Sequence, residues 1–245
     1  MPIEGEAALT RLLGALQFLT VLPIRRSTCA PGEAAAYFPL VGALVGLAAA
    51  GTHTLLAYAV APSINALIAV LVMVLLTGAL HEDGLADCAD AFGGSRPPDK
   101  ILAILKDSRI GTFGALALIF SIGLRWQAIA QTGSHLWETM AAAGALSRAA
   151  QVGVAWISRP AGEGSGKLFA LTLTTPRALM AFAIAIVIAV PLGVVAFPAV
   201  VGTAGFTVIA RDYFERHLGG VNGDCCGALS QLVEGFVLLL CASIW

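Results

Sequence analysis

Residues 178–196 read ALMAFAIAIVIAVPLGVVA, an apolar run in which no side chain carries a charge. About 20 such residues are needed for a helix to cross a hydrocarbon core roughly 30 Å thick, so this run predicts a transmembrane helix. The whole chain of 245 residues has a similar character, since 58% of it is hydrophobic and only 12% is charged. An ordinary soluble domain carries about 25% charged residues. The composition therefore predicts an integral membrane protein.

Further apolar runs predict an all-α fold, a polytopic transmembrane bundle of about seven spans, with one membrane domain over residues 1–245. Residues 8–22 are apolar but short and end at Pro23, which indicates an additional N-terminal interfacial or re-entrant helix. The other expected spans are residues 38–60, 63–80, 112–132, 138–157, 198–216 and 225–244.

Seven spans place every second connection on the same side of the membrane, namely residues 23–37, 81–111, 158–177 and 217–224. Lys and Arg gather on that side, whereas the opposite connections contain none. Positively charged loops tend to stay in the cytoplasm, so this side is predicted to be cytoplasmic. Its basic residues, span ends included, are Arg25, Arg26, Arg96, Lys100, Lys106, Arg109, Arg159, Lys167, Arg177, Arg211 and Arg216.

Charge and cysteine content argue against several classes of protein. The net charge is -1 and the pI about 6.4, which does not fit the basic surface of a nucleic-acid-binding domain. The five cysteines form no C-x-x-C pair, so neither a zinc site nor a disulfide framework is indicated. We also expect no removable secretory signal, because Glu4 and Glu6 precede the first basic residue, Arg11, and no small-residue cleavage site follows the apolar run.

Residues 81–90, HEDGLADCAD, follow the second expected span and hold the strongest chemical signal. In a helix Asp83, Asp87 and Asp90 stand at i, i+4 and i+7, so their carboxylates share one face. Two carboxylates about 6 Å apart repel by about 3 kcal/mol at an effective dielectric constant near 20. Mg²⁺ relieves such repulsion and typically binds one or two carboxylates together with substrate phosphate oxygens. The motif predicts a Mg²⁺ site and a phosphate-bearing substrate, with a solvated acidic loop as the alternative.

A second polar segment, KDSRIGTFG at residues 106–114, leads into the third expected span. Its basic residues, hydroxyls and glycines at a helix N-terminus are suited to holding phosphate oxygens, although ordinary loops also have this composition. The segment AGEGSGKL at residues 161–168 resembles a phosphate-binding P-loop superficially. Ala161 and Leu168 break that pattern, so we interpret residues 158–177 as a mobile loop that covers a substrate.

Arg125 and Arg148 fall inside the third and fourth expected spans, where an unpaired charge costs at least about 3 kcal/mol. Structural pairing and anion binding both stay open. We favour substrate phosphate as the partner of Arg148 and a structural or snorkelling role for Arg125. The segment GGVNGDCCG at residues 219–227 precedes the last span, and there Asp224 can cap the helix or bind a metal.

These motifs, in this order and over most of the chain, resemble the cobalamin synthase family, the adenosylcobinamide-GDP ribazoletransferases of the late vitamin B12 pathway. Glu82 departs from the pattern, because an apolar residue is expected there. The residues that carry the resemblance are Phe18-Leu19-Thr20, Leu22-Pro23, Phe38-Pro39-Leu40-Val41-Gly42, His81, Asp83-Gly84-Leu85-Ala86-Asp87, Asp90, Asp107-Ser108-Arg109, Gly111-Thr112, Gly114, Ser147-Arg148, Gly219-Gly220, Gly223-Asp224, Gly227 and Glu234.

The resemblance implies a Mg²⁺-dependent enzyme of the bacterial inner membrane whose active face is cytoplasmic. Its reaction joins adenosylcobinamide-GDP to alpha-ribazole or alpha-ribazole 5'-phosphate, releases GMP, and gives adenosylcobalamin or its phosphate. On this basis the candidate metal ligands are Asp83, Asp87, Asp90 and Asp224. The catalytic candidates are His81, Asp83 and Asp90. The substrate-binding candidates are Lys106, Ser108, Arg109, Arg148, Asn222 and Asp224.

Two other classes of protein stay open. CDP-alcohol phosphotransferases also carry aspartates spaced D-x-x-D-G at a membrane face, but their Ala-Arg pair and further aspartates are absent from this sequence. A cation-coupled transporter would place polar groups along the full membrane depth, whereas the motifs here gather on one side. Besides small-molecule substrates we expect contact with membrane lipid and no nucleic acid, and homo-oligomerisation stays open.

Overall fold

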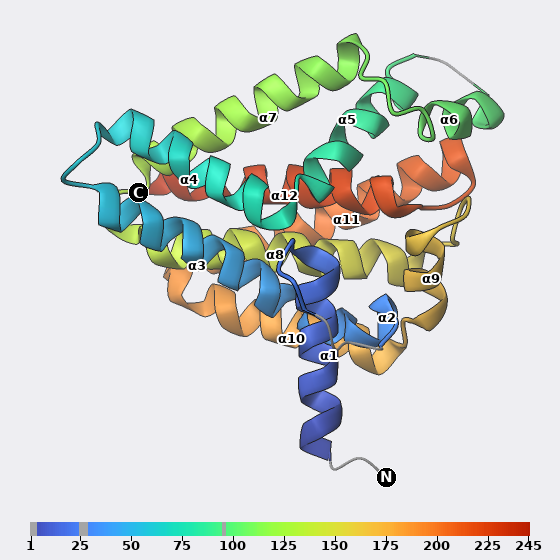
Figure 1. The fold of residues 1–245 in the computed structure, drawn as a ribbon, viewed down its shortest axis with the longest axis horizontal. Coiled ribbons are helices and arrows are strands. Elements are labelled where there is room, and N and C mark those ends of the chain that lie inside the picture. Colours follow the sequence, from blue (N-terminus) through green and yellow to red (C-terminus); the bar gives the residue numbers. More distant parts are fainter. Residues whose placement is uncertain (1–3, 25–28, 95–96) are drawn as a thin grey trace.

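The computed structural model describes residues 4–24, 29–94 and 97–245, and within these ranges it contains helices and no strands (Figure 1). The expected all-α fold is confirmed. Arg25, Arg26 and Arg96, which we assigned to the side predicted to be cytoplasmic, lie outside the described residues. In chain order the helices are α1 Glu4–Leu19, α2 Pro31–Ala34, η1 Ala35–Tyr37, α3 Phe38–Leu56, α4 Pro62–Thr77, α5 Leu80–Phe92, α6 Pro98–Ile104, α7 Thr112–Gln131, η2 Gly133–His135, α8 Leu136–Ile157, α9 Ser165–Thr172, α10 Thr175–Ala189, η3 Val190–Val195, α11 Ala196–Leu218 and α12 Gly223–Ile244.

Each apolar run that predicts a span contains a helix, but the number of crossings is not confirmed. Four helical segments in the described part of the chain are long and apolar enough to cross a membrane. A fifth is added if α4 and α5, which meet at 91°, form one broken span. The four segments are Pro31–Leu56, Thr112–Gln131, Thr175–Leu218 and Gly223–Ile244.

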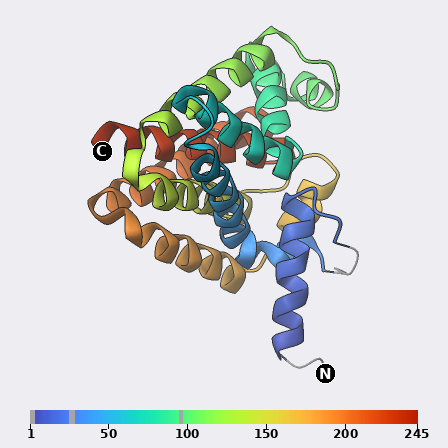
Figure 2. The ribbon, with the colours of Figure 1, turned by 60° about the vertical axis from the view of Figure 1, so that its left-hand side comes forward.

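Helix α8 occupies the centre of the bundle, where it packs against α3, α10, α11 and α12 (Figures 1 and 2). It is not among the four apolar segments, because a helix enclosed by other helices does not need a lipid-facing surface. Gly42 of α3 and Gly144 of α8 face each other so closely that a Cβ on either would collide with the other's carbonyl group. Small residues therefore hold the central pair backbone to backbone.

The connection between α4 and α5 changes the direction of the chain by 91° just before the acidic motif. Gly78 and Ala79 have φ of 61° and 58°, so the chain leaves the right-handed helical conformation for two residues. Glycine adopts this conformation readily, whereas alanine does so at a steric cost. The new helix, α5, begins at Leu80 and includes residues 81–90, so the condition under which Asp83, Asp87 and Asp90 share one face is met.

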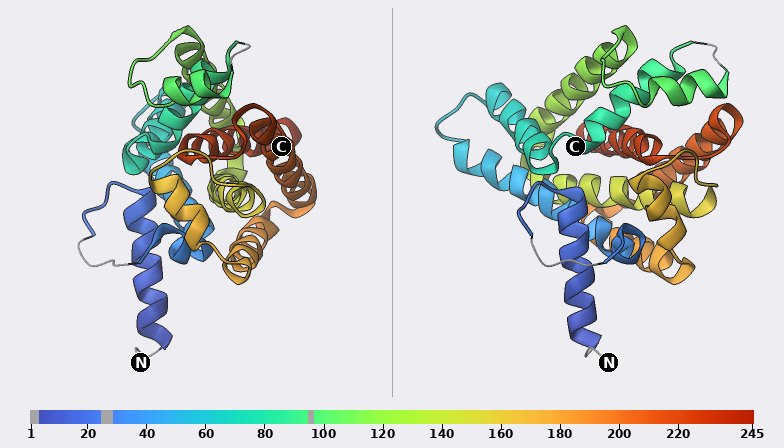
Figure 3. Two further views of the ribbon diagram at one scale, coloured as in Figure 1. Left: turned by 90° about the vertical axis from the view of Figure 1, so that its right-hand side faces the viewer. Right: turned by 45° about the vertical axis from the view of Figure 1, so that its right-hand side comes forward.

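Helix α1 runs across the direction of the bundle helices, and its N-terminal end projects away from them (Figures 1 and 3). Its C-terminal end is anchored where Phe18 stacks on Phe38, with ring centroids 5.6 Å apart. A helix that lies across a transmembrane bundle suits an interfacial position, and the interfacial or re-entrant placement of residues 8–22 stays a prediction.

Candidate active site

Two faces of α5 have different environments. Asp83 is exposed and Asp87 is half-buried, whereas His81 and Glu82, on the other side of the helix, are 0% and 5% exposed. The carboxylate of Asp87 lies within electrostatic range of the charges on Asp83, Asp90 and Asp224. The shared acidic face predicted from the spacing is therefore present, and the last helix contributes to it.

Close packing of α5 on α12 brings Asp224 to this face. A Cβ added to Gly84 would lie 2.8 Å from the carbonyl oxygen of Asp224, and one added to Gly227 would lie 3.4 Å from Cα of His81. Gly84 thus lets the two helix backbones approach more closely than a side chain at that position would allow, whereas a Cβ on Gly227 would make ordinary contact. A larger residue at position 84 would move Asp224 away from the aspartates of α5.

The N-terminus of α12 is capped by Asn222, not by Asp224. The Asn222 Oδ1 atom accepts a hydrogen bond of 2.9 Å from the Cys225 N–H, as an N-cap residue does. Its Nδ2 donates a second hydrogen bond of 2.7 Å to Asp224. Asp224 is consequently free of the capping role that the sequence allowed, and Asn222 orients its carboxylate.

A cavity of about 110 Å³ opens between α5, α8, α9 and α12. Its lining includes Asp83 of α5, Asp224 of α12, and Ser165 and Gly166 of α9. In the left view of Figure 3, α9 (gold) lies beside the beginning of α12 (red). The backbones of Gly166 and Gly223 meet there without room for a Cβ on Gly166. The segment 158–177 therefore borders the aspartates, while its mobility stays a prediction.

Asp90 caps a helix. One carboxylate oxygen accepts a 2.7 Å hydrogen bond from the Gly111 N–H and the other a 2.9 Å hydrogen bond from the Gly114 N–H. These N–H groups belong to the N-terminus of α7, whose positive end favours a carboxylate. The backbone expected to hold substrate phosphate thus holds Asp90, and both oxygens of this expected metal ligand and base are already engaged.

Lys106, Ser108 and Arg109 are exposed and do not line the cavity. The Arg109 guanidinium forms an ion pair of 2.6 Å with Asp107. Hydrogen bonds from the Arg109 side chain and backbone hold the pKa of Asp107 below its usual value. The structure therefore places these residues on the segment that leads into α7, next to Asp90 rather than next to Asp83.

A buried ion network joins α5, α7, α8 and α12. Arg125 pairs with Glu82 and Glu234, both at 3.0 Å, and Arg148 pairs with Glu234 and with the Ser147 hydroxyl. The structural role favoured for Arg125 matches this placement. Arg148, expected to bind substrate phosphate, is instead only 2% exposed and has a protein carboxylate as its partner. Glu82, which breaks the family pattern, is part of the network.

Several buried polar atoms beside this network have no well-aligned hydrogen-bond partner among the residues that the structure describes. They are both ring nitrogens of His81, Gln151 Oε1, Ser230 Oγ and Glu82 Oε2, although the Gln151 side chain lies beside the His81 ring. Buried polar groups of this kind usually bind ordered water. His81 is fully buried and does not line the cavity, which separates this expected base from the aspartates' open side.

Sequence reasoning did not single out Gln151, Ser165 or Phe169, although all three line the cavity. Gln151 stands three residues after Arg148 and so shares its face of α8, a signal the sequence contains. Ser165 and Phe169 come from the segment that matches no established motif, and only the packing of α9 against α12 brings them to the aspartates.

The carboxylate oxygens at this site suit a Mg²⁺ ion that takes only part of its ligands from the protein. Among the described residues no three His, Cys, Asp or Glu side chains form a group that could by itself hold a metal ion. Mg²⁺ commonly uses one or two protein carboxylates and takes its remaining ligands from water and substrate phosphates. Asp83, Asp87 and Asp224 offer hard oxygen donors of this kind, so these residues fit the ion.

Comparisons with known proteins decide the family. The model of a family described as Cobalamin-5-phosphate synthase matches residues 11–242. This chain belongs to that family. The resemblance inferred from the spaced motifs is confirmed, and the match extends over nearly the whole chain.

Several curated proteins named Adenosylcobinamide-GDP ribazoletransferase are similar to this family member. The protein from Ralstonia pickettii is 37% identical over 234 residues, 91% of each chain. The protein from Geotalea daltonii is 35% identical, covering 94% of this chain and 96% of its own. The protein from Sinorhizobium medicae is 42% identical over 84% of each chain. No solved structure matches.

Proposed function

We propose that this chain is a membrane transferase that joins adenosylcobinamide-GDP to alpha-ribazole or alpha-ribazole 5'-phosphate and releases GMP. The product is adenosylcobalamin or its phosphate. The observation that carries the proposal is that Asp83, Asp87 and Asp224 gather beside one cavity in a chain that matches the family over residues 11–242. Relatives that share 35% to 42% of their residues carry the name of this activity.

We propose Mg²⁺ as the cofactor, held by Asp83, Asp87 and Asp224. When bound, the ion offsets negative charge on a pyrophosphate and on the departing phosphate group. Asp90 contributes indirectly, because it fixes the N-terminus of α7 against α5. Without a cation the clustered carboxylates repel one another, which favours cation binding at this position.

The transfer forms a bond between a hydroxyl oxygen of the ribazole and the phosphorus nearer the corrinoid. The bond from that phosphorus to the oxygen of GMP breaks, and the hydroxyl proton goes to a base. Asp83 is exposed and lines the cavity, so it is our candidate for this base as well as for a Mg²⁺ ligand. Gly166 and Gly223 border the same space, and the missing side chain of Gly166 lets α9 pack directly against the N-terminus of α12 beside Asp224.

We propose that Lys106, Ser108 and Arg109 contact substrate phosphates. Support comes from the position of their segment, which Gly111 ties to Asp90 on the helix that also carries Asp83. Because the Arg109 guanidinium is already at the protein surface, it can exchange its ion pair with Asp107 for one with a phosphate. We do not propose Arg148 as a phosphate ligand, because its guanidinium forms an ion pair with Glu234.

We propose that the site faces the cytoplasm from the inner membrane. Helices α6 and α9 and the C-terminal end of α11 lie at one end of the bundle in Figure 1. Lys167 belongs to α9, Arg216 lies in the last turn of α11, and Lys106 follows α6 by two residues. The connections at the opposite end, residues 57–61 and 132–135, contain neither Lys nor Arg. This asymmetry is the pattern of cytoplasmic loops.

The proposal is tested with purified protein, both substrates and a GMP measurement. We expect GMP release with Mg²⁺ and none after chelation. A CDP-linked alcohol donor offered in place of adenosylcobinamide-GDP separates this activity from that of a CDP-alcohol phosphotransferase. Uptake of substrate into sealed vesicles without phosphate-bond cleavage would contradict the proposal and support a transporter.

A further inference from the structure

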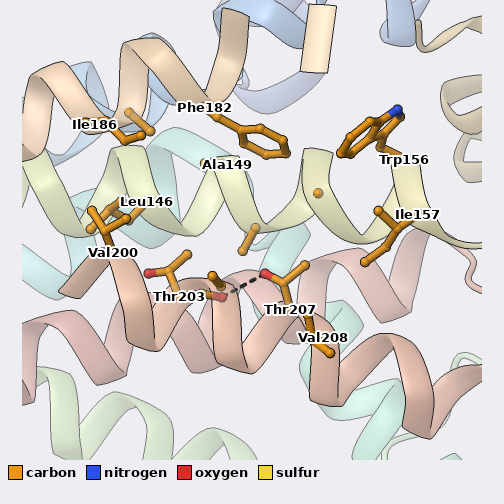
Figure 4. Close-up of a pocket in the computed structure, with 14 residues that line it drawn as sticks. Leu146, Ala149, Trp156, Ile157, Phe182, Ile186, Val200, Thr203, Thr207 and Val208 are labelled. Atoms are coloured by element: carbon orange, nitrogen blue, oxygen red, sulfur yellow. Dashed lines mark hydrogen bonds between the residues drawn. The ribbon is translucent and has the colours of Figure 1, made fainter. Parts of the chain in front are cut away.

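A second cavity, of about 320 Å³, lies between α8, α10 and α11 (Figure 4). It shares no lining residue with the aspartate cavity. Its walls are almost entirely apolar and include Leu146 and Trp156 of α8, Phe182 and Ile186 of α10, and Val200 and Val208 of α11. The groove is therefore separate from the proposed transfer site and has a different chemistry.

The hydroxyl groups in this groove are already used. Thr203 donates to the Ala199 carbonyl and Thr207 to the Thr203 carbonyl, both at 2.8 Å, within α11. Figure 4 shows the Thr207 bond running along the helix and not into the groove. No polar group of the walls is left to orient a polar ligand, so the groove suits a hydrocarbon occupant.

The groove opens on the outer surface of the bundle. Ile186 is 48% exposed and Val208 is 59% exposed, and both belong to Thr175–Leu218, a segment long and apolar enough to cross a membrane. In a bilayer this surface faces lipid, so an acyl chain is the hydrocarbon available to fill it. Packing against an acyl chain recovers dispersion contacts that an empty groove would lose.

Helix α11 carries a cation, Arg211, about one turn beyond the last residues of α11 that line the groove. Arg211 follows Thr207 and Val208 by four and three residues, so it continues the groove-lining stripe of α11. Helical side chains lean toward the N-terminus, which directs Arg211 back over the groove. Arg211 is half-buried and makes no hydrogen bond or ion pair with any residue that the structure describes, whereas Arg216 pairs with Asp212.

Trp156 marks the same end of the groove. Its ring lines the cavity, and its Nε1 donates a 3.2 Å hydrogen bond to the Thr175 hydroxyl. Tryptophan with an apolar body and a bonded N–H is typical of the level of lipid headgroups. A phosphate at this level would lie within reach of the unpaired Arg211.

We propose that the groove between α8, α10 and α11 binds a phospholipid, with an acyl chain along its apolar walls and the lipid phosphate on Arg211. The apolar lining selects the chain and the guanidinium selects the phosphate. Both parts are needed, so a lipid without phosphate and a headgroup without chains bind more weakly.

Native mass spectrometry of the detergent-purified full chain tests this proposal. The probes are phosphatidylglycerol, diacylglycerol with the same acyl chains, and glycerophosphoglycerol, which has the headgroup alone. We expect one retained phosphatidylglycerol per chain, with at least about five-fold weaker retention of diacylglycerol, the ratio for about one cation–phosphate contact. Glycerophosphoglycerol should not be retained.

Two variants with matched controls locate the site. Arg211→Gln should lower retention of phosphatidylglycerol about five-fold and bring it to the level of diacylglycerol, while Arg216→Gln, on the same helix, leaves it unchanged. Ala204→Phe fills the groove and should abolish retention, while Val201→Phe, an exposed position on α11 outside the groove, should not. Unchanged melting temperatures show that the variants fold.

Equal retention of phosphatidylglycerol and diacylglycerol, or no effect of Arg211→Gln, overturns the phosphate contact. A lipid-free dimer that Ala204→Phe dissociates also overturns the proposal, because a second copy of the chain would then cover the groove.

Discussion

At the scale of single residues, Asp83 and Asp90 belong to the same helix but have different environments. Asp83 is exposed and lines the cavity, and its carboxylate makes no hydrogen bond with a described residue, whereas both oxygens of the Asp90 carboxylate accept backbone N–H groups of α7. The two residues should therefore respond differently to substitution, one in the reaction and the other in stability.

Asp83→Asn should reduce GMP release by about 100-fold or more while leaving the melting temperature close to that of the native protein. An exposed carboxylate with no bond to a described residue contributes little to folding. The measurement is steady-state GMP formation at saturating Mg²⁺. Asp99→Asn, an exposed acidic residue of α6, is the matched control and should keep full activity. Full activity of Asp83→Asn would remove this residue from the proposed site.

Asp90→Ala should lower the free energy of unfolding by about 1–2 kcal/mol, because it leaves two N–H groups at the start of α7 without their acceptor. Thermal or denaturant unfolding in detergent measures the change. Asp90→Asn should lose less, because its amide oxygen can still accept one of the two bonds. Equal stability of Asp90→Ala and the native protein would contradict the capping role.

At the scale of helices, the site depends on how α5, α7, α8 and α12 are held together. Backbone contact through glycines sets the distance between α5 and α12, and the buried ion network joins those helices to α7 and α8. Arg125 contacts two carboxylates on different helices, so losing either one leaves buried charge uncompensated.

Gly84→Ala should separate α5 from α12, since its Cβ would stand 2.8 Å from the Asp224 carbonyl oxygen. We expect a loss of about 1–3 kcal/mol in stability from overpacking and about a 100-fold loss in GMP release from the displaced aspartates. Gly235→Ala on α12 is the control, because its Cβ meets nothing within 4 Å. That variant should gain about 0.5–1 kcal/mol of helix stability. Native activity in Gly84→Ala would show that close packing here is dispensable.

Glu234→Gln should cost about 3–5 kcal/mol of stability, because Arg125 and Arg148 both lose a buried partner. Folded yield and melting temperature in detergent measure the loss. The double variant Arg148→Met/Glu234→Met removes one charge of each sign and tests coupling within the network. If the loss of stability in the double variant equals the sum of the losses in Arg148→Met and Glu234→Met, Arg148 and Glu234 do not stabilise each other.

At the scale of the whole molecule, the connections at residues 57–61 and 132–135, which contain no Lys or Arg, lie at the opposite end of the bundle from α6 and α9 (Figure 1). The four or five apolar segments suggest a membrane protein, and the family match extends across them. Which end faces the cytoplasm decides whether the proposed substrates can reach the aspartates.

Tyr58→Cys and Ser108→Cys, in a chain whose half-buried Cys29 is replaced by Ser, test the orientation. Both positions are exposed, and they lie in the connection after α3 and in the connection before α7. A membrane-impermeant maleimide should label Tyr58→Cys in intact spheroplasts and Ser108→Cys only in inside-out vesicles. Labelling of both from the same side would contradict the proposed arrangement.

Much of the architecture follows from local sequence. The apolar runs predict the helices, because satisfying backbone hydrogen bonds in hydrocarbon requires helices of nearly that length. The spacing of Asp83 and Asp87 predicts their shared face, since a helix repeats every 3.6 residues. The number of crossings does not follow, because α8 is enclosed by protein and α4 turns into α5 at 91°.

The sequence by itself determined the helical membrane fold, the acidic face of α5 and the family, because all three depend on local periodicity or on the order of motifs. Only the tertiary structure decided that Asp90 caps α7, that Asn222 caps α12, and that Glu234 binds Arg148. The last contact spans 86 residues of sequence, and the contact between Arg125 and Glu234 spans 109. Such partners are selected by helix packing, which places side chains together according to their contacts in space rather than their spacing along the chain.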